Sequence, residues 1–167
     1  RPPAPQPPRL TVLQAATESE MNYAIFDGLD RLKYQNWELT GAVTFYESDV
    51  SINHSIFRNN NCEDGLNIVR SEFSFNKSRI SDTFSDGLDA DFCKGYISNS
   101  TFLRTGNDGM DLSGSVVLID NCTAEDCGDK GVSIGEESDA TIFQINIKGS
   151  PIGVASNDLS VLTIRDI

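Results

Sequence analysis

Aspartate recurs at a fixed interval in this chain, and a cluster of oxygen ligands is the chemistry that it could supply. The stretches NCEDGLNIV, FSDGLDADF and TGNDGMDLS follow one another at 22-residue spacing. Their side chains are Asp64, Asp86, Asp89, Asp91, Asp108 and Asp111. Hard carboxylate oxygens are the ligands that Ca²⁺ prefers. These six aspartates are therefore candidate metal ligands, although the chain has neither an EF-hand loop nor the calcium-binding nonapeptide.

Stacked aspartates need a counter-charge, because like charges at the spacing of neighbouring strands repel by about 1 kcal/mol per pair even in water. A bound cation, a raised carboxyl pKa or a basic side chain would each relieve the repulsion. Lys94, Arg104 and Lys130 are the candidate basic partners. A competing interpretation is that aspartate directly before glycine serves a turn. That explains the first aspartate of each cluster better than those inside the strand pattern.

The interval belongs to a repeat that runs through most of the chain. Glycines fall at 65, 87, 109, 131 and 153, and a short pattern of alternating polarity follows each one. A second pattern, of the form I-x-x-S-x-F, begins near 52, 75, 97, 119 and 142. Alternation predicts strands whose apolar members point inward. Each copy is too small to bury its own apolar face, so the copies must stack.

Short strands at this period, without helical patterning between them, predict an all-β solenoid of about 22 residues per coil. The D-G-apolar-D/N and I-x-x-S-x-F patterns resemble those of the right-handed parallel β-helix family, the pectate-lyase-like superfamily. The resemblance covers roughly residues 39–167. A leucine-rich repeat is the alternative by period, but its leucine and asparagine framework is absent.

Composition bounds the rest of the chain. Its 167 residues carry a formal net charge of −12, which disfavours nucleic acid and anionic membranes as partners. No apolar run approaches the length of a membrane span. We expect residues 1–9 to form a proline-rich linker or arm, residues 10–38 an N-terminal cap or irregular initial coils, and residues 39–167 the β-helix. We expect the chain to be a fragment or processed product of a secreted or surface protein.

The four cysteines match no CxxC zinc signature. Cys122 replaces serine in the small inward column of the second pattern, which predicts a buried thiol. The spacing of the others along the solenoid does not favour disulfides.

The resemblance implies Ca²⁺-binding carboxylates and a Lys or Arg base if the chain is an enzyme, namely a polysaccharide lyase or epimerase. However, no catalytic motif of the family matches residue by residue, and the period leaves little room for loops that would wall a groove. We therefore expect a non-catalytic accessory or structural module with a cation-binding patch and a polysaccharide or protein partner. Two alternatives stay open: a fragment of such an enzyme, and a unit that stacks end to end through Val161 and Ile164.

Overall fold

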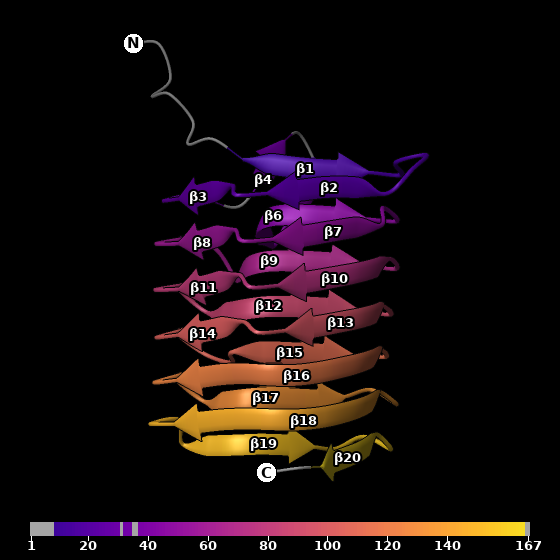
Figure 1. The fold of residues 1–167 in the computed structure, drawn as a ribbon. Helices are drawn as coiled ribbons and strands as arrows, with labels where there is room; N and C mark the ends of the chain where they lie inside the picture. Colours follow the sequence, from indigo (N-terminus) through magenta and orange to yellow (C-terminus); the bar gives the residue numbers. More distant parts are fainter. Residues whose placement is uncertain (1–8, 31, 35–36, 166–167) are drawn as a thin grey trace.

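Parallel strands stack along one axis in the computed structural model, which describes residues 9–30, 32–34 and 37–165 (Figure 1). The coils number about six, at about 22 residues each. The described part of the chain contains no helix, and thus none that is long and apolar enough to cross a membrane. The predicted all-β parallel solenoid is confirmed.

Two parallel sheets form the walls of the solenoid. The first sheet contains β1 (Leu10–Leu13), β6 (Gly41–Tyr46), β9 (Asp64–Val69), β12 (Asp86–Asp91), β15 (Met110–Ser113), β17 (Lys130–Gly135) and β19 (Ile152–Ser156). The second sheet has one row made of β2 (Ser19–Asn22), β7 (Val50–Asn53), β10 (Glu72–Asn76) and β13 (Lys94–Ser98), and another made of β3 (Ile25–Asp27), β8 (Ile56–Arg58), β11 (Arg79–Ser81) and β14 (Thr101–Leu103). Both rows continue into the long strands β16 (Val116–Glu125) and β18 (Asp139–Lys148), and β20 (Val161–Arg165) pairs with β18.

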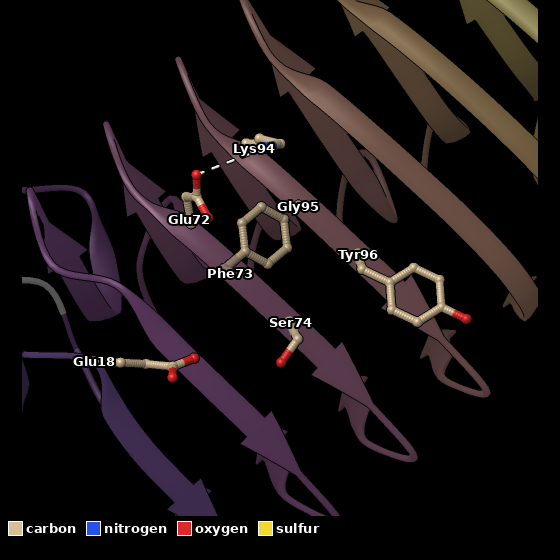
Figure 2. Close-up of a pocket in the computed structure, with 7 residues that line it drawn as sticks. All are labelled: Glu18, Glu72, Phe73, Ser74, Lys94, Gly95 and Tyr96. Atoms are coloured by element: carbon tan, nitrogen blue, oxygen red, sulfur yellow. Dashed lines mark ion pairs between the residues drawn. The ribbon is translucent and has the colours of Figure 1, made fainter.

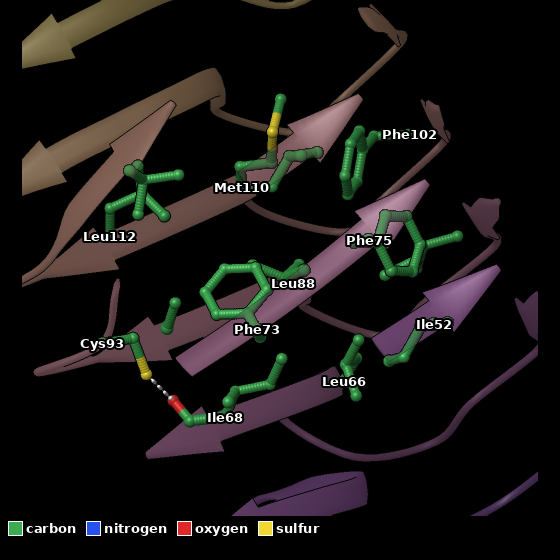
Figure 3. Close-up of a cluster of buried hydrophobic side chains, with 14 of the residues drawn as sticks. Ile52, Leu66, Ile68, Phe73, Phe75, Leu88, Cys93, Phe102, Met110 and Leu112 are labelled. Atoms are coloured by element: carbon green, nitrogen blue, oxygen red, sulfur yellow. Dashed lines mark hydrogen bonds between the residues drawn. The ribbon is translucent and has the colours of Figure 1, made fainter. Parts of the chain in front are cut away.

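The register places the repeats in line, so that inward side chains stack into columns (Figure 3). Leu66, Leu88, Met110 and Val132 are partners across the first sheet and are fully buried. The second sheet supplies an aromatic column in which Phe57, Phe75 and Phe102 lie 5.8–6.1 Å apart between ring centroids. Val154 and Ser156, which the pattern also predicts to point inward, are half-buried and exposed, respectively, in the last described first-sheet strand.

Each coil turns at three corners, where the backbone adopts the left-handed conformation, with φ between 47° and 76°. Most corners have one such residue, but Glu136 is followed by Glu137 and Asp158 by Leu159. The first corner, after the first-sheet strand, holds Gln14, Glu47, Arg70, Phe92, Gly114 and Glu136. The second holds Tyr23, His54, Lys77, Asn99, Asn121 and Gln144, and the third holds Gly28, Asn59, Asp82, Arg104, Asp126 and Gly149. Most are not glycine, so the stacked coils must hold a conformation that costs such residues free energy.

A ladder of buried side chains supports these corners. At the first two corners of the middle coils, the residue after the left-handed one is mostly serine, and it accepts a hydrogen bond from the equivalent backbone N–H of the preceding coil. Examples are Ser48 N–H to Ser71 Oγ at 2.8 Å and Ser55 N–H to Ser78 Oγ at 3.0 Å. Each of these hydroxyls donates to the carbonyl two residues earlier in its own coil. This explains the small inward column of the sequence pattern, because the corner interrupts the backbone ladder and a hydroxyl replaces the missing partner.

Cysteine substitutes for serine in the same ladder. The Cys93 thiol donates to the Ile68 carbonyl at 3.2 Å (Figure 3), and Cys122 donates to the carbonyl of Asp120 at 3.3 Å. All four cysteines are free and buried, so the predicted buried thiol at Cys122 is confirmed. Burial raises the pKa of both Cys93 and Cys122 to about 11, which keeps them as unreactive thiols.

The N-terminal region is more regular than a cap. Strands β1, β2 and β3 pair in parallel with β6, β7 and β8, so residues 10–27 supply a complete first coil. The next coil follows after 31 to 33 residues, as in the pairs Ser19↔Val50 and Leu10↔Val43. The antiparallel pair β4 (Leu32–Tyr34) and β5 (Trp37–Leu39) accounts for the extra length. Of the expected arm, residues 1–8 lie outside the described residues.

Candidate functional site: the acidic face of the first sheet

The aspartates that precede glycine have a structural task in the middle coils. Asp86 Oδ1 accepts hydrogen bonds from the Asp108 backbone N–H at 2.7 Å and from Asn107 Nδ2 at 2.8 Å. Asp108 Oδ1 accepts the Lys130 backbone N–H at 3.0 Å. Both carboxyls are buried. They accept hydrogen bonds from backbone N–H groups of the following coil. This structural role is the alternative to metal binding that the sequence left open for aspartates before glycine.

Asp64 occupies the same column but lacks this partner. Its side chain is 2% exposed, and its Oδ2 atom is buried without a hydrogen bond. The Asp86 N–H, which would be its equivalent donor, instead donates to the Glu63 carbonyl at 2.8 Å. The Thr40 hydroxyl donates to Asp64 but leaves Oδ2 unpartnered. An unsatisfied, buried carboxylate oxygen is costly and needs an explanation.

A second acidic column points away from the core on the same sheet. Asn67, Asp89, Asp111 and Ser133 are partners in successive coils. The Asn67 amide donates to Asp89 Oδ2 at 2.9 Å, and both aspartates are half-buried. Asp91 lies two residues further along β12. We call the group Asp64, Asn67, Asp89, Asp91 and Asp111 the acidic face.

The upper end of this column is more enclosed than the alternation predicts. Thr44 and Asn67 occupy outward positions, yet both are buried, as are most residues of β6 and β9 on either face. The Thr44 hydroxyl oxygen is also without a hydrogen bond. Alternation assigns a side chain to a face of the sheet but not the cover over that face, so the sequence pattern could not reveal this burial.

Desolvation dominates the electrostatics of the acidic face. It raises the pKa of Asp89 to about 9, with repulsion from Asp64, Asp91 and Asp111 adding to the effect. The pKa of Asp64 rises to about 7 for the same reason, with repulsion from Asp86 and Glu63. The pKa of Asp111 rises to about 6. Burial also raises the pKa of Asp86, Asp91 and Asp108.

Of the three expected basic partners, the structure brings one to these columns. The Lys130 ammonium lies 3.3 Å from Asp108 Oδ2 and also contacts Asp129. Arg104 instead pairs with Asp82 at the third corner, at 2.7 Å. Lys94 lies on the second sheet, 3.7 Å from Glu72. The period gives the coil in which a basic residue lies but not the side of the coil to which it points.

The surroundings of Lys94 form a shallow pocket on the second sheet, of about 300 Å³ (Figure 2). Its lining residues are Glu18, Glu72, Phe73, Ser74, Lys94, Gly95 and Tyr96. Phe73 points into the core beneath Gly95, where a Cβ atom would approach its ring to 2.3 Å. The acidic face contributes nothing to the lining of this pocket.

Among the described residues, the acidic face offers a metal ion oxygen atoms but no complete set of ligands. Within the described ranges, no group of three or more His, Cys, Asp and Glu side chains is arranged to hold a metal. The carboxylates are therefore not a preformed cage. Asp64 Oδ2 and the Thr44 hydroxyl are nevertheless oxygen atoms without partners, and Ca²⁺ accepts hydroxyl, amide and water oxygens beside carboxylates. Asn67 and Thr44 are the residues that a search for acidic ligands missed, although both occupy the register of Asp89.

The C-terminal end of the solenoid is apolar and open in the described chain. Strand β20 pairs only with β18, and Val161 and Ile164 are 56% and 38% exposed. Both residues lie on β20, an edge strand of the described sheet (Figure 1), and the end contact expected of them stays a prediction.

Comparison with known proteins agrees with the fold. No curated protein and no solved structure matches the chain. A family model described as a right handed beta helix region matches residues 64–166, which is more than half of the chain. The matched segment begins at β9 and includes every coil that carries the acidic face. The chain therefore belongs to the right-handed β-helix family.

Proposed function

We propose that this chain is a non-catalytic β-helix module of a secreted or surface protein, and that its acidic face binds a divalent cation, Ca²⁺ by its oxygen ligands. The observation that carries the proposal is the buried Oδ2 atom of Asp64, which has no hydrogen-bond partner and whose carboxyl repels that of Asp89. A cation would satisfy this oxygen and remove the repulsion among the carboxylates in one step. In this proposal the ion also prepares the face for a polysaccharide or protein partner.

A metal ion suits the site better than an internal basic residue. Lys94 and Arg104 are engaged with carboxylates elsewhere, and Lys130 serves Asp108. Of the two lysines considered as a base for a lyase or epimerase, Lys94 lies on the second sheet. Lys130 is held by Asp108 and Asp129, and its charge partly offsets the burial that raises the pKa of Asp111. A hydrated ion is expected, because Asp86 and Asp108 already accept backbone donors and only a few protein oxygens are left to coordinate it.

Thermal unfolding with Ca²⁺, with Mg²⁺ and with EDTA tests the proposal. Ca²⁺ at 100 times its dissociation constant should stabilise the protein by about 2.7 kcal/mol, which corresponds to about 5–11 °C for a chain of this length. The Asp89→Asn/Asp111→Asn variant should lose the shift. Asp139→Asn/Asp158→Asn, which removes the same charge from exposed positions, should keep it. Equal midpoints in Ca²⁺ and EDTA would refute the cation site.

A second candidate function is end-to-end self-association, favoured by the exposed apolar side chains on the edge strand β20. Light scattering should then give a mass that rises with concentration, and Val161→Glu should abolish the rise. Val116→Glu is the matched control, because Val116 is 55% exposed in the same column of the second sheet but two strands in from the edge strand. A constant monomer mass at all concentrations would rule out this function.

A further inference from the structure

Two phenylalanines flank strand β12, and both are exposed at corners of the coil. Phe84 precedes the strand and is 70% exposed, while Phe92 follows it and is 56% exposed. A single exposed apolar side chain is ordinary on a protein surface, so the neighbours of each ring decide whether it has a role. The two rings therefore form an internal comparison, since they share residue type, coil and an acidic neighbourhood.

Phe92 has an intramolecular cation. The Arg70 guanidinium carbon lies 5.7 Å from the centre of its ring and 6.0 Å from that of Tyr46. The positive charge of Arg70 also favours the ionised form of Asp91. On its other side the Phe92 ring fills the space above Gly114, where a Cβ atom would come within 2.6 Å of it. An aromatic ring, a carboxylate and a guanidinium thus complete one another at this corner.

Phe84 has the first two of these groups. It lines a pocket of about 420 Å³ with Asp30, Asn61, Cys62, Glu63 and Ser85. Asp30 has its own interaction within the chain, whereas Glu63 forms no ion pair with any described residue. None of the described lining residues is basic. The pocket therefore presents a ring and a carboxylate without the cation that Arg70 supplies to Phe92.

We propose that this pocket, formed around Phe84 and Glu63, binds an arginine side chain of a partner protein. A guanidinium group stacks on an aromatic face and donates a planar fork of hydrogen bonds to a carboxylate, as a lysine ammonium cannot. The net charge of −12 attracts a basic segment and repels an acidic one. The inference goes beyond the cation site, because Phe84 and Glu63 are not ligands of that site.

The test compares two fluorescein-labelled peptides of equal charge, one with three arginines and one with three lysines, by fluorescence anisotropy in EDTA. Non-specific attraction to the acidic chain is common to both peptides, so the ratio of their affinities isolates the site. The wild-type protein should bind the arginine peptide about five- to tenfold more tightly. Phe84→Ala and Glu63→Gln should each remove this preference, and Phe92→Ala should retain it.

Equal binding of the two peptides, or a preference that survives Phe84→Ala, would overturn the proposal. Thermal midpoints of the variants show whether a lost preference reflects unfolding. Arg31, next to Asp30 in the sequence, lies outside the described residues. If only the Arg31→Ala variant preferred the arginine peptide, Arg31 of the chain itself would occupy the pocket in the wild-type protein. That result would also overturn the proposal. Because EDTA is present throughout, failure of the cation site does not affect this result.

Discussion

The third corner and the acidic face treat charge in opposite ways, although both are stacks of equivalent residues. At the third corner opposite charges meet between coils: Asp27 with Arg58 at 2.8 Å, Asp82 with Arg104 at 2.7 Å, and Glu125 with Lys148 at 3.4 Å. On the acidic face Asp89 and Asp111 meet directly, and Asp64 lies close enough to repel Asp89.

The difference separates structural charge from candidate functional charge. A parallel solenoid brings equivalent residues to one strand spacing, about 4.8 Å, so alternating signs are an available solution. The chain uses that solution at an exposed corner, where each pair contributes little. On the acidic face, where the carboxylates are half-buried and repulsion is stronger, the signs of the charges do not alternate. The acidic face thus lacks the alternation of charge found at the third corner. Local conflicts of this kind are expected at functional sites.

The largest expected effect comes from removing the cation that Lys130 supplies. Lys130→Met leaves the buried Asp108 carboxylate without its ion pair, which should lower the free energy of unfolding by about 2 kcal/mol. The thermal midpoint should then fall by about 4–8 °C, as measured by circular dichroism. Lys148→Met, which removes an exposed lysine from the third corner, is the control and should change the midpoint far less. Similar losses in the two variants would break the comparison.

A smaller effect should follow from pH. In EDTA the thermal midpoint should fall as the pH rises from 5 to 9. The pKa values of Asp111, Asp64 and Asp89 are raised to about 6, 7 and 9, whereas unfolded aspartates titrate near 4. The folded chain therefore binds more protons than the unfolded chain over this range, and stability that is complete below about pH 4 is lost as the pH passes these values. A midpoint that rises over the same range would contradict the burial of the acidic face.

Neutralising part of the acidic face should recover part of that loss. At pH 10 in EDTA, where both carboxyls are ionised, Asp89→Asn/Asp111→Asn removes one like-charge contact and should raise the free energy of unfolding by about 1 kcal/mol. The thermal midpoint should rise by about 2–4 °C. At pH 5 the gain should shrink, because the raised pKa values leave both side chains largely neutral. Equal gains at both pH values would point to a cause other than charge.

The smallest effect is expected at the third corner. Arg104→Gln removes the partner of Asp82 from an exposed pair, and such pairs contribute little in water. We expect a change in thermal midpoint of less than about 2 °C, and 1 M NaCl should reduce it further by screening. A loss comparable to that of Lys130→Met would mean that exposed pairs carry more stability in this solenoid than elsewhere.

The sequence predicts the coils better than it predicts the site. Period and alternation suffice for the inward columns, because Leu66 and its equivalents must face the core in any parallel stack. They do not determine which way a corner residue points, and so Lys94 and Arg104 could not be placed. They also cannot distinguish Asp86, which accepts a backbone N–H, from Asp64, which lacks that donor. Both aspartates stand before glycine in the same register, and they differ in what the next backbone N–H contacts: the Asp108 N–H donates to Asp86 Oδ1, whereas the Asp86 N–H donates to the Glu63 carbonyl.

The serine ladder has a consequence for the length of the molecule. Each rung joins an N–H of one coil to a hydroxyl of the next, so every middle coil brings one acceptor and presents one donor at a corner. A whole coil can therefore be duplicated or deleted without leaving a donor unmatched, whereas a single inserted residue would displace every rung in its coil. The hydrogen bonding therefore allows the solenoid to lengthen or shorten by whole coils. Such a change in length leaves the packing of the remaining core columns unchanged.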